Sequence, residues 1–206
     1  MPSGSRLLDI GTDHALLPIY LLQQGRISTA IAGDRSRLPL QQAQKRKNQS
    51  NISDDQLQLI HSNGFQQLVV QRGDVAVLAG MGGRMMQEIL SSPKVRNLSA
   101  LILQPNRNVF ELRSFLQHNN WLITNEKMIL ENDQFYPTLF VEEGTRVLSL
   151  REAYFGPVFL MNRPPEWIQW IQKQHAILQT IQERTGERMP IEKRKHWLWT
   201  KEILNC

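Results

Sequence analysis

The stretch Leu7-Leu8-Asp9-Ile10-Gly11-Thr12-Asp13-His14 decides the fold of this chain. Its apolar half predicts a short buried strand, and its glycine and carboxylates predict a tight turn directly after that strand. A helical pattern follows at once over residues 15–24. A strand, a glycine turn and a helix in this order form a cradle for a nucleotide cofactor.

The chemistry of this turn discriminates between nucleotide cofactors. It lacks the second and third glycines of the fingerprint G-x-G-x-x-G, so it leaves less room for a pyrophosphate against the backbone. Asp13 would also repel a phosphate at the start of the following helix. These features argue against a nicotinamide oxidoreductase. An acidic turn suits a cationic cofactor, and S-adenosylmethionine, with its sulfonium and amino groups, is the obvious candidate.

Length and composition are those of a globular protein. The 206 residues, 41% apolar and 21% charged, are enough for one domain with a sizeable core and an appendage. The net charge of +5 favours an anionic partner without proving one. The single cysteine, Cys206, excludes an internal disulfide. The chain shows no membrane-spanning run, no signal peptide and no metal-ligand spacing, so we expect a soluble cytoplasmic protein without a metal.

Short apolar runs alternate with helical patterns along most of the chain. Strands are expected at residues 7–10, 30–33, 57–61, 74–79 and 101–103, and helices at 15–24, 38–48, 84–90 and 109–118. This alternation predicts an α/β fold with a mostly parallel, doubly wound sheet. Two further strands, 121–130 and 136–142, are joined only by a short polar segment, which predicts an antiparallel hairpin at one edge. Such a sheet is typical of Rossmann-like methyltransferases.

The last part of the chain has a different character. Pro164-Pro165-Glu166 is a helix-start signal, and apolar residues at helical spacing follow it. Thr185-Gly186 and Pro190 interrupt this pattern before a second helical stretch over residues 191–204. We therefore expect a cofactor-binding domain over residues 1–158 and a C-terminal helical hairpin over residues 159–206.

Ligands of doubly wound sheets bind at the carboxyl ends of the strands. A polar or glycine-rich segment follows each of the first five expected strands: Asp9 with Gly11, Thr12 and Asp13; Gly33-Asp34; Asn63-Gly64; Gly80-Met81-Gly82-Gly83 after Ala79; and Gln104-Pro105-Asn106. Asp34 could accept both ribose hydroxyls, and Asn63 could hydrogen-bond the adenine edge. Each segment alone could be structural, with Asp34 as a helix cap and the glycines as a turn. Five such segments, each directly after an expected strand, together favour a cofactor site.

These motifs resemble the bacterial tRNA (adenine-N1) methyltransferases that modify the adenine at position 22. The resemblance rests on the D-I-G-T-D-H-A-L-L-P segment that starts at Asp9, on A-G-M-G-G from Ala79 and on Q-P-N from Gln104. It extends from about Leu7 to at least Gly156-Pro157 and more loosely through the helical tail. It implies a Rossmann-like methyltransferase domain, S-adenosylmethionine as cofactor and a helical hairpin that helps to hold tRNA. Family members usually carry Glu at the position of Asp34 and Asp at that of Asn63, and both changes keep a hydrogen-bond acceptor.

The resemblance also implies roles for individual residues. Cofactor contacts fall to Asp9, Gly11, Thr12, Asp13, Gly33, Asp34, Asn63, Gly64, Ala79 and Gly80. Methyl transfer to N1 of an exposed adenine would occur beside Met81, Gly82, Gly83, Asn106 and Tyr136. Asn106 and Gln104 could read the base edge, and Tyr136, Phe135 or Met81 could stack on the base. We expect Phe135 rather to pack within the hairpin. His14 could handle the proton after transfer, but we expect it rather to form a hydrogen bond at the helix start.

Basic residues gather at and beyond the helical break. Arg188, Lys193, Arg194, Lys195 and Lys201 are the candidates for contacts with the tRNA backbone, although a solvated helix face is the common alternative. The tryptophans of this segment, Trp167, Trp170, Trp197 and Trp199, are expected to pack in the hairpin. Two other functions stay open: a methyltransferase for another RNA position or a small molecule, and a catalytically silent RNA-binding protein. The sequence implies no oligomer.

Overall fold

The computed structural model describes residues 5–205, so Cys206 lies outside the described residues. It contains one seven-stranded sheet with the order β3-β2-β1-β4-β5-β7-β6. The strands are β1 (Arg6–Ile10), β2 (Thr29–Asp34), β3 (Leu57–His61), β4 (Asp74–Met81), β5 (Leu98–Pro105), β6 (Trp121–Glu131) and β7 (Gln134–Glu143). β1 to β5 run parallel, and β7 pairs antiparallel with both β5 and β6. The predicted doubly wound sheet with a reversed edge hairpin is confirmed.

The helices follow the predicted order, with two additions. They are α1 (Leu16–Gln23), α2 (Arg37–Gln49), α3 (Gly83–Leu90), α4 (Val109–His118), α5 (Leu150–Phe155), α6 (Pro157–Asn162), α7 (Pro165–Thr185) and α8 (Ile191–Asn205), with short 3-10 turns at Pro93–Asn97 and Gly186–Arg188. The sequence analysis missed α5 and α6. Each is six residues long, too short to show a helical period, although Ser149 and Glu152 form a capping box at the start of α5.

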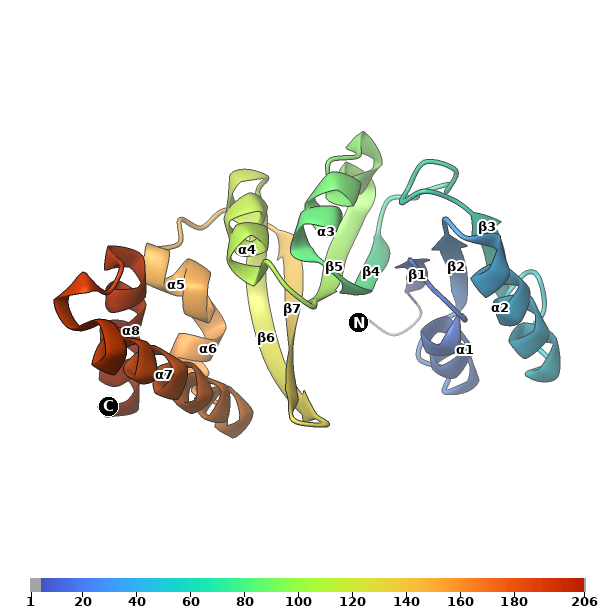
Figure 1. Cartoon of the computed structure of the whole chain (residues 1–206). Coiled ribbons are helices and arrows are strands. Elements are labelled where there is room, and N and C mark those ends of the chain that lie inside the picture. The colour runs from blue at the N-terminus through green and yellow to red at the C-terminus, as the bar shows by residue number, and fades with distance from the viewer. Residues whose placement is uncertain (1–4, 206) are drawn as a thin grey trace.

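Alternation along β1 builds the two faces of the sheet. Leu7 packs with Ile19 of α1 and Ala43 of α2, whereas Leu8 packs with Met86 of α3 and Leu112 of α4. Successive side chains of a strand point to opposite faces, so one apolar run serves both layers. Figure 1 shows α1 and α2 near one end of the sheet and α5 to α8 beyond β6 at the other.

The hairpin between β6 and β7 closes on Asn132-Asp133. Both residues have positive φ, 48° and 61°, and the pair Glu131 and Gln134 flanks them. Asn and Asp tolerate this conformation, which the tight two-residue hairpin turn requires. The polar linker in the sequence therefore predicted this turn correctly.

A buried ion pair joins α5 and α6 to the sheet. Arg113 of α4 donates from Nε to Glu126 Oε1 of β6 over 2.9 Å, and its Nη1 donates to the carbonyls of Ala153 and Tyr154. Glu126 Oε2 accepts from the backbone N–H groups of Val158 at 2.9 Å and Phe159 at 3.3 Å. Each oxygen of this carboxylate therefore has a protein donor.

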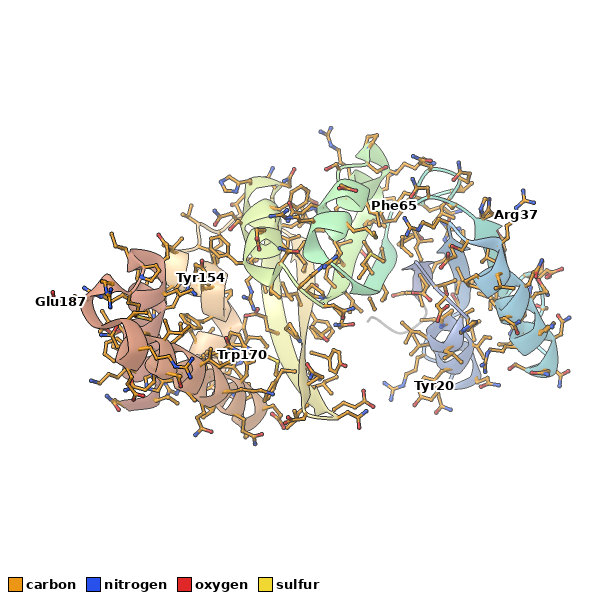
Figure 2. All side chains as sticks on the ribbon, viewed as in Figure 1. Tyr20, Arg37, Phe65, Tyr154, Trp170 and Glu187 are labelled. Atoms are coloured by element: carbon orange, nitrogen blue, oxygen red, sulfur yellow. The ribbon has the colours of Figure 1, made fainter. Side chains whose placement is uncertain are left out.

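The two C-terminal helices pack on each other and on α5 and α6. Trp167 is fully buried and donates from Nε1 to the Phe155 carbonyl, and Trp170 and Trp199 belong to the same apolar cluster. Trp197 donates to Gln179 across the α7–α8 contact. Figure 2 shows Tyr154 and Trp170 among these helices. All four tryptophans thus pack as expected.

Within the described residues, no helix is long and apolar enough to cross a membrane. The same residues contain no cluster of three metal-ligating side chains. The expected domain boundary at residue 158 falls inside α6, and the division into two domains stays a prediction.

Candidate cofactor and methyl-transfer site

The turn after β1 lies at the switch point of the sheet, between β2 and β4. The backbone N–H groups of Gly11 and Thr12 donate to the Gly33 carbonyl at 2.8 and 3.1 Å, which ties this turn to the end of β2. Gly11 has a φ of +74°, and a Cβ there would lie 2.8 Å from the Met81 side chain. The backbone conformation therefore favours glycine, and a side chain there would also displace the end of Met81.

Asp9 is a buried carboxylate with few partners. It is 6% exposed, and Thr12 Oγ1 donates to its Oδ2 over 2.5 Å. Among the described residues, no lysine, arginine or histidine forms an ion pair with it. Burial raises the pKa of Asp9 to about 6, with a smaller contribution from the charge of Asp34 against the opposing hydrogen bond of Thr12. A cationic ligand would complete its environment.

Asp34 lies at the end of β2 and is half-buried. Its Oδ1 accepts from the Ser36 N–H at 2.8 Å, and its Oδ2 accepts from the Asp13 N–H at 3.2 Å. Asp34 is therefore not the cap of α2, whose N-cap is Ser36 without a side-chain hydrogen bond, but it binds the N–H of that N-cap residue. Each carboxylate oxygen has a further lone pair, so the same side chain can still accept from two ribose hydroxyls.

A cavity of about 580 Å³ opens beside these turns. That volume lies within the range of small-molecule and cofactor sites. Its lining includes Gly11, Asp34, Ser62, Asn63, Gly64, Phe65, Met81, Met85 and Ile89. Gly11 of the first turn and Asp34 therefore meet the segment after β3 and helix α3 around one cavity, whose lining does not include Asp9, Thr12 or Asp13.

The sequence analysis missed Ser62, Phe65, Met85 and Ile89 in this lining. Phe65 is buried between the segment after β3 and α3 (Figure 2), and apolar residues of this kind look like ordinary core in a sequence. Met85 and Ile89 are four residues apart on α3, and this spacing could have indicated a shared helix face. Asn63 itself is exposed, and its backbone N–H donates to Gln67.

The loops after β4 and β5 are joined by hydrogen bonds. Gly80 N–H donates to Gln104 Oε1 at 2.9 Å, and Asn106 Nδ2 donates to the Gly80 carbonyl at 2.8 Å. The Asn106 N–H donates to the Met81 carbonyl, and the Gly83 N–H to the Arg107 carbonyl. A Cβ on Gly83 would collide with backbone atoms of Asn108. The structure therefore brings together the residues from Gly80 to Gly83 with Gln104 and Asn106, as the motifs predicted.

Tyr136 and Phe135 lie on opposite faces of β7. Phe135 packs in a cluster that contains Met128 of the hairpin, as expected, and also aromatic residues of the C-terminal helices, which was not predicted. Lys173 lies 5.7 Å from its ring centre. Successive residues of a strand point to opposite faces, so Tyr136 lies on the face opposite to Phe135. Gln104 of β5 lies on the same face as Tyr136, because its neighbours Leu103 and Pro105 are buried on the other face. Tyr136 is half-buried and remains a candidate for contact with the base.

The expectation for His14 is wrong. α1 begins without a side-chain cap, because Ala15 adopts the left-handed conformation and its N–H donates to the Thr12 carbonyl. His14 Nε2 lies 3.5 Å from Asp13 Oδ1 instead.

The basic candidates of the tail differ in their surroundings. Arg188, Lys193, Lys195 and Lys201 are exposed, and Lys195 and Lys201 lie over the rings of Trp199 and Trp197 at 4.9 and 5.5 Å. The Arg194 guanidinium donates to the carbonyls of Gly186 and Glu187 and so closes the turn between α7 and α8.

The sheet order, the acidic first turn and the carboxylate after β2 define a Rossmann-like, S-adenosylmethionine-dependent methyltransferase. The chain belongs to the tRNA (adenine(22)-N(1))-methyltransferase family, whose model matches residues 7–202. It is therefore a tRNA adenine-N1 methyltransferase, and this excludes the alternatives of a small-molecule substrate and a silent RNA-binding protein.

Individual relatives agree with this assignment. The tRNA (adenine(22)-N(1))-methyltransferase of Bacillus subtilis is 26% identical over 216 residues, which cover 99% of this chain and 90% of the relative. A Streptococcus pneumoniae protein solved with S-adenosyl-L-methionine is 34% identical, with a TM-score of 0.86 over 98% of this chain and 93% of that one. A Mycoplasma capricolum protein solved with S-adenosyl-homocysteine is 27% identical, with a TM-score of 0.81 over 98% and 90% of the two chains.

Proposed function

We propose that this methyltransferase holds S-adenosylmethionine between the ends of β1 to β4 and helix α3, and modifies adenine 22 of tRNA beside the loops after β4 and β5. The observation that carries this assignment is Asp9, a buried carboxylate that has a hydroxyl partner and no cationic partner among residues 5–205. Burial of a charge is stabilised when a complementary charge reaches it. The ammonium group of the cofactor has the chemistry that Asp9 needs.

The remaining cofactor contacts are assigned from the strand ends around the cavity, which Gly11, Asp34, Asn63 and Gly64 line. Asp9, Gly11, Thr12 and Asp13 would surround the amino acid end, with Ala79 and Gly80 beside it. Gly33 and Asp34 would hold the ribose through the free lone pairs of Asp34. Asn63 and Gly64 would flank the adenine ring, with Phe65 and Ile89 supplying apolar walls.

The reaction needs alignment more than acid–base chemistry. The bound cofactor would supply an electrophilic methyl group on a positively charged sulfur. N1 of adenine already carries a lone pair that can attack the methyl carbon, so that an N–C bond forms as the C–S bond breaks and the neutral thioether leaves. The loops Gly80–Gly83 and Gln104–Asn106 would orient the base, and Tyr136 or Met81 would stack on it. Fixed hydrogen bonds between these loops keep the site preorganised.

The exposed basic residues of α8 and of the preceding turn would contact the tRNA backbone. We assign this role to Arg188, Lys193, Lys195 and Lys201, whose charged groups reach solvent. Arg194 would contribute indirectly, because its guanidinium already binds carbonyls of the turn. A C-terminal unit over residues 159–206 would thus act as the tRNA-binding appendage of a domain over residues 1–158, in a cytoplasmic enzyme.

The assignment of the substrate position is tested with two transcripts. Methyl incorporation from labelled S-adenosylmethionine is measured on unmodified tRNA with adenine at position 22 and on the same tRNA with guanine there. We expect incorporation only with adenine. Equal incorporation into both transcripts would refute the position, and no incorporation by a protein that binds cofactor would refute the substrate.

A further inference from the structure

Two side-chain amides and one backbone unit form a closed triangle at the reaction loops. Gln104 Oε1 accepts from the Gly80 N–H at 2.9 Å, and Asn106 Nδ2 donates to the Gly80 carbonyl at 2.8 Å. The third side joins the amides themselves, with Gln104 Nε2 donating to Asn106 Oδ1 over 3.1 Å. Gly80 offers both of its backbone groups to this triangle, with a φ of +72° that favours glycine.

Backbone polarity leaves one arrangement for these amides. An N–H can only donate, so the atom of Gln104 that meets the Gly80 N–H must be its oxygen. A carbonyl can only accept, so the atom of Asn106 that meets the Gly80 carbonyl must be its nitrogen. The remaining atoms, the Gln104 nitrogen and the Asn106 oxygen, then meet with matching polarity. Turning either amide by half a turn would break two of the three bonds.

The locked amide of Asn106 keeps one hydrogen on Nδ2 and one lone pair on Oδ1 for a ligand. Asn106 is exposed, whereas Gln104 is half-buried with both amide atoms engaged. The triangle occupies the amide edge on which Oδ1 and one hydrogen of Nδ2 lie side by side, so the remaining lone pair and hydrogen point apart. The free lone pair of Oδ1 can accept from N6–H of adenine. That contact leaves N1 free, whereas guanine would place its O6 acceptor against the Asn106 oxygen.

We propose that Gln104 is a positioning residue: it locks the Asn106 amide in the orientation whose Oδ1 accepts from N6 of adenine. Gln104 acts through Asn106 and does not itself read the base. This inference rests on the proposed function, because it places the target base beside Asn106.

The test compares two transcripts, one with adenine and one with unsubstituted purine at position 22, in single-turnover methylation. Purine keeps N1 and N7 and lacks the N6 amino group. We expect the wild-type protein to prefer adenine by about tenfold or more, since one hydrogen bond is lost and the Asn106 acceptor is left unpaired. Any intrinsic difference in N1 reactivity is common to all protein variants and cancels when their ratios are compared.

Two substitutions break the lock in different ways. Gln104→Glu keeps an acceptor for the Gly80 N–H and places a second acceptor against Asn106 Oδ1, whereas Gln104→Met removes both contacts. We expect both to reduce the preference for adenine to within about threefold of that of Asn106→Ala, because the rate falls more on the adenine transcript than on the purine transcript. Adding Gln104→Met to Asn106→Ala should change the ratio no further. Gln117→Glu is the matched control, because Gln117 likewise accepts from one backbone N–H, that of Leu148, away from these loops.

A readout without turnover examines the lock directly. The side-chain amide of Asn106, followed by nitrogen-15 NMR, should exchange its hydrogens more slowly in the wild-type protein than in Gln104→Met. Equal exchange, or a Gln104 variant that keeps the wild-type preference, would overturn the inference. So would equal losses on both transcripts, which indicate a merely structural role. A wild-type protein that methylates both transcripts equally refutes the inference alone, whereas one that methylates neither refutes the proposed function.

Discussion

Asp9 and Glu126 are both buried carboxylates, and their surroundings differ sharply. Glu126 has the Arg113 guanidinium and two backbone N–H groups on its oxygens. Asp9 has the hydroxyl of Thr12, and the nearby charge of Asp34 adds to the cost of ionising it. Glu126 is therefore satisfied by the protein itself, whereas Asp9 is not.

This difference separates a structural ion pair, Arg113–Glu126, from a ligand site. Arg113 and Glu126 connect α4 and β6 to α5 and α6, so their ion pair holds the helical tail on the sheet. Asp9 lies below the glycine turn at the switch point, where ligands of this fold bind. A buried carboxylate that lacks a cationic partner among the described residues thus indicates where a ligand of opposite charge belongs.

The largest expected effect concerns the Arg113–Glu126 ion pair. Arg113→Met leaves the Glu126 carboxylate buried without its cation, so the free energy of unfolding should fall by about 3–5 kcal/mol in urea denaturation. Arg151→Met is the control, since Arg151 pairs with Glu202 near the surface at 3.2 Å and should cost less than about 1 kcal/mol. Equal decreases in the free energy of unfolding of the two variants would contradict the structural role of the Arg113–Glu126 ion pair.

A smaller effect is expected from the titration of Asp9 in the ligand-free protein. Its pKa is raised from 3.8 to about 6 in the folded state, so between these values the folded protein keeps a proton that the unfolded chain releases. Stability relative to Asp9→Asn should therefore decrease as the pH rises through this window, by up to about 3 kcal/mol. Denaturation of both proteins at pH 4 and pH 7.5 measures it, and a constant difference would show that Asp9 is not destabilised by burial.

The third prediction concerns cofactor affinity. Asp9→Asn keeps the size of the side chain and removes the charge, so the Kd for S-adenosylmethionine should rise about 10- to 100-fold, as expected for loss of a charged hydrogen bond. Asp133→Asn, in the exposed hairpin turn, is the matched control and should leave the Kd unchanged. An unchanged Kd in Asp9→Asn would remove Asp9 from the cofactor site.

The smallest effect tests whether the tail serves tRNA separately from the cofactor pocket. Lys193→Glu with Lys195→Glu should weaken tRNA binding and reduce its salt dependence by about 0.7–0.9 log units per log unit of salt for each lost phosphate contact. Cofactor affinity should not change. Lys45→Glu, on the exposed side of α2 at the other end of the molecule, is the control (Figure 1). If the salt dependence of tRNA affinity is equal in all these proteins, the α8 lysines form a solvated helix face and do not contact tRNA.

The fold followed from the sequence wherever periodicity was long enough to count. Strands and helices up to β7 were predicted in order, and α7 and α8 followed from their proline and glycine boundaries. The Arg113–Glu126 ion pair could not be predicted from periodicity. Glu126 turns inward because a register shift between Ile123 and Asn125 interrupts the alternation of β6, and a charged residue in a strand otherwise indicates a solvent face.

The site was predicted by position and not by geometry. Asp9, Asp34 and the loops at Gly80 and Asn106 follow strands whose ends meet at one edge, so their proximity could be inferred. The triangle of Gly80, Gln104 and Asn106 depends on how two loops far apart in sequence meet. No local pattern encodes that contact.

The most direct test of the difference between Asp9 and Glu126 is the number of protons released when S-adenosylmethionine binds at pH 5.5, obtained by calorimetry in buffers of different ionisation enthalpy. A carboxyl with a pKa of about 6 is largely protonated at that pH and must ionise to bind a cation. The wild-type protein should release about 0.7 proton more than Asp9→Asn. Equal proton release by the two proteins would contradict the assignment of Asp9 to the cofactor ammonium.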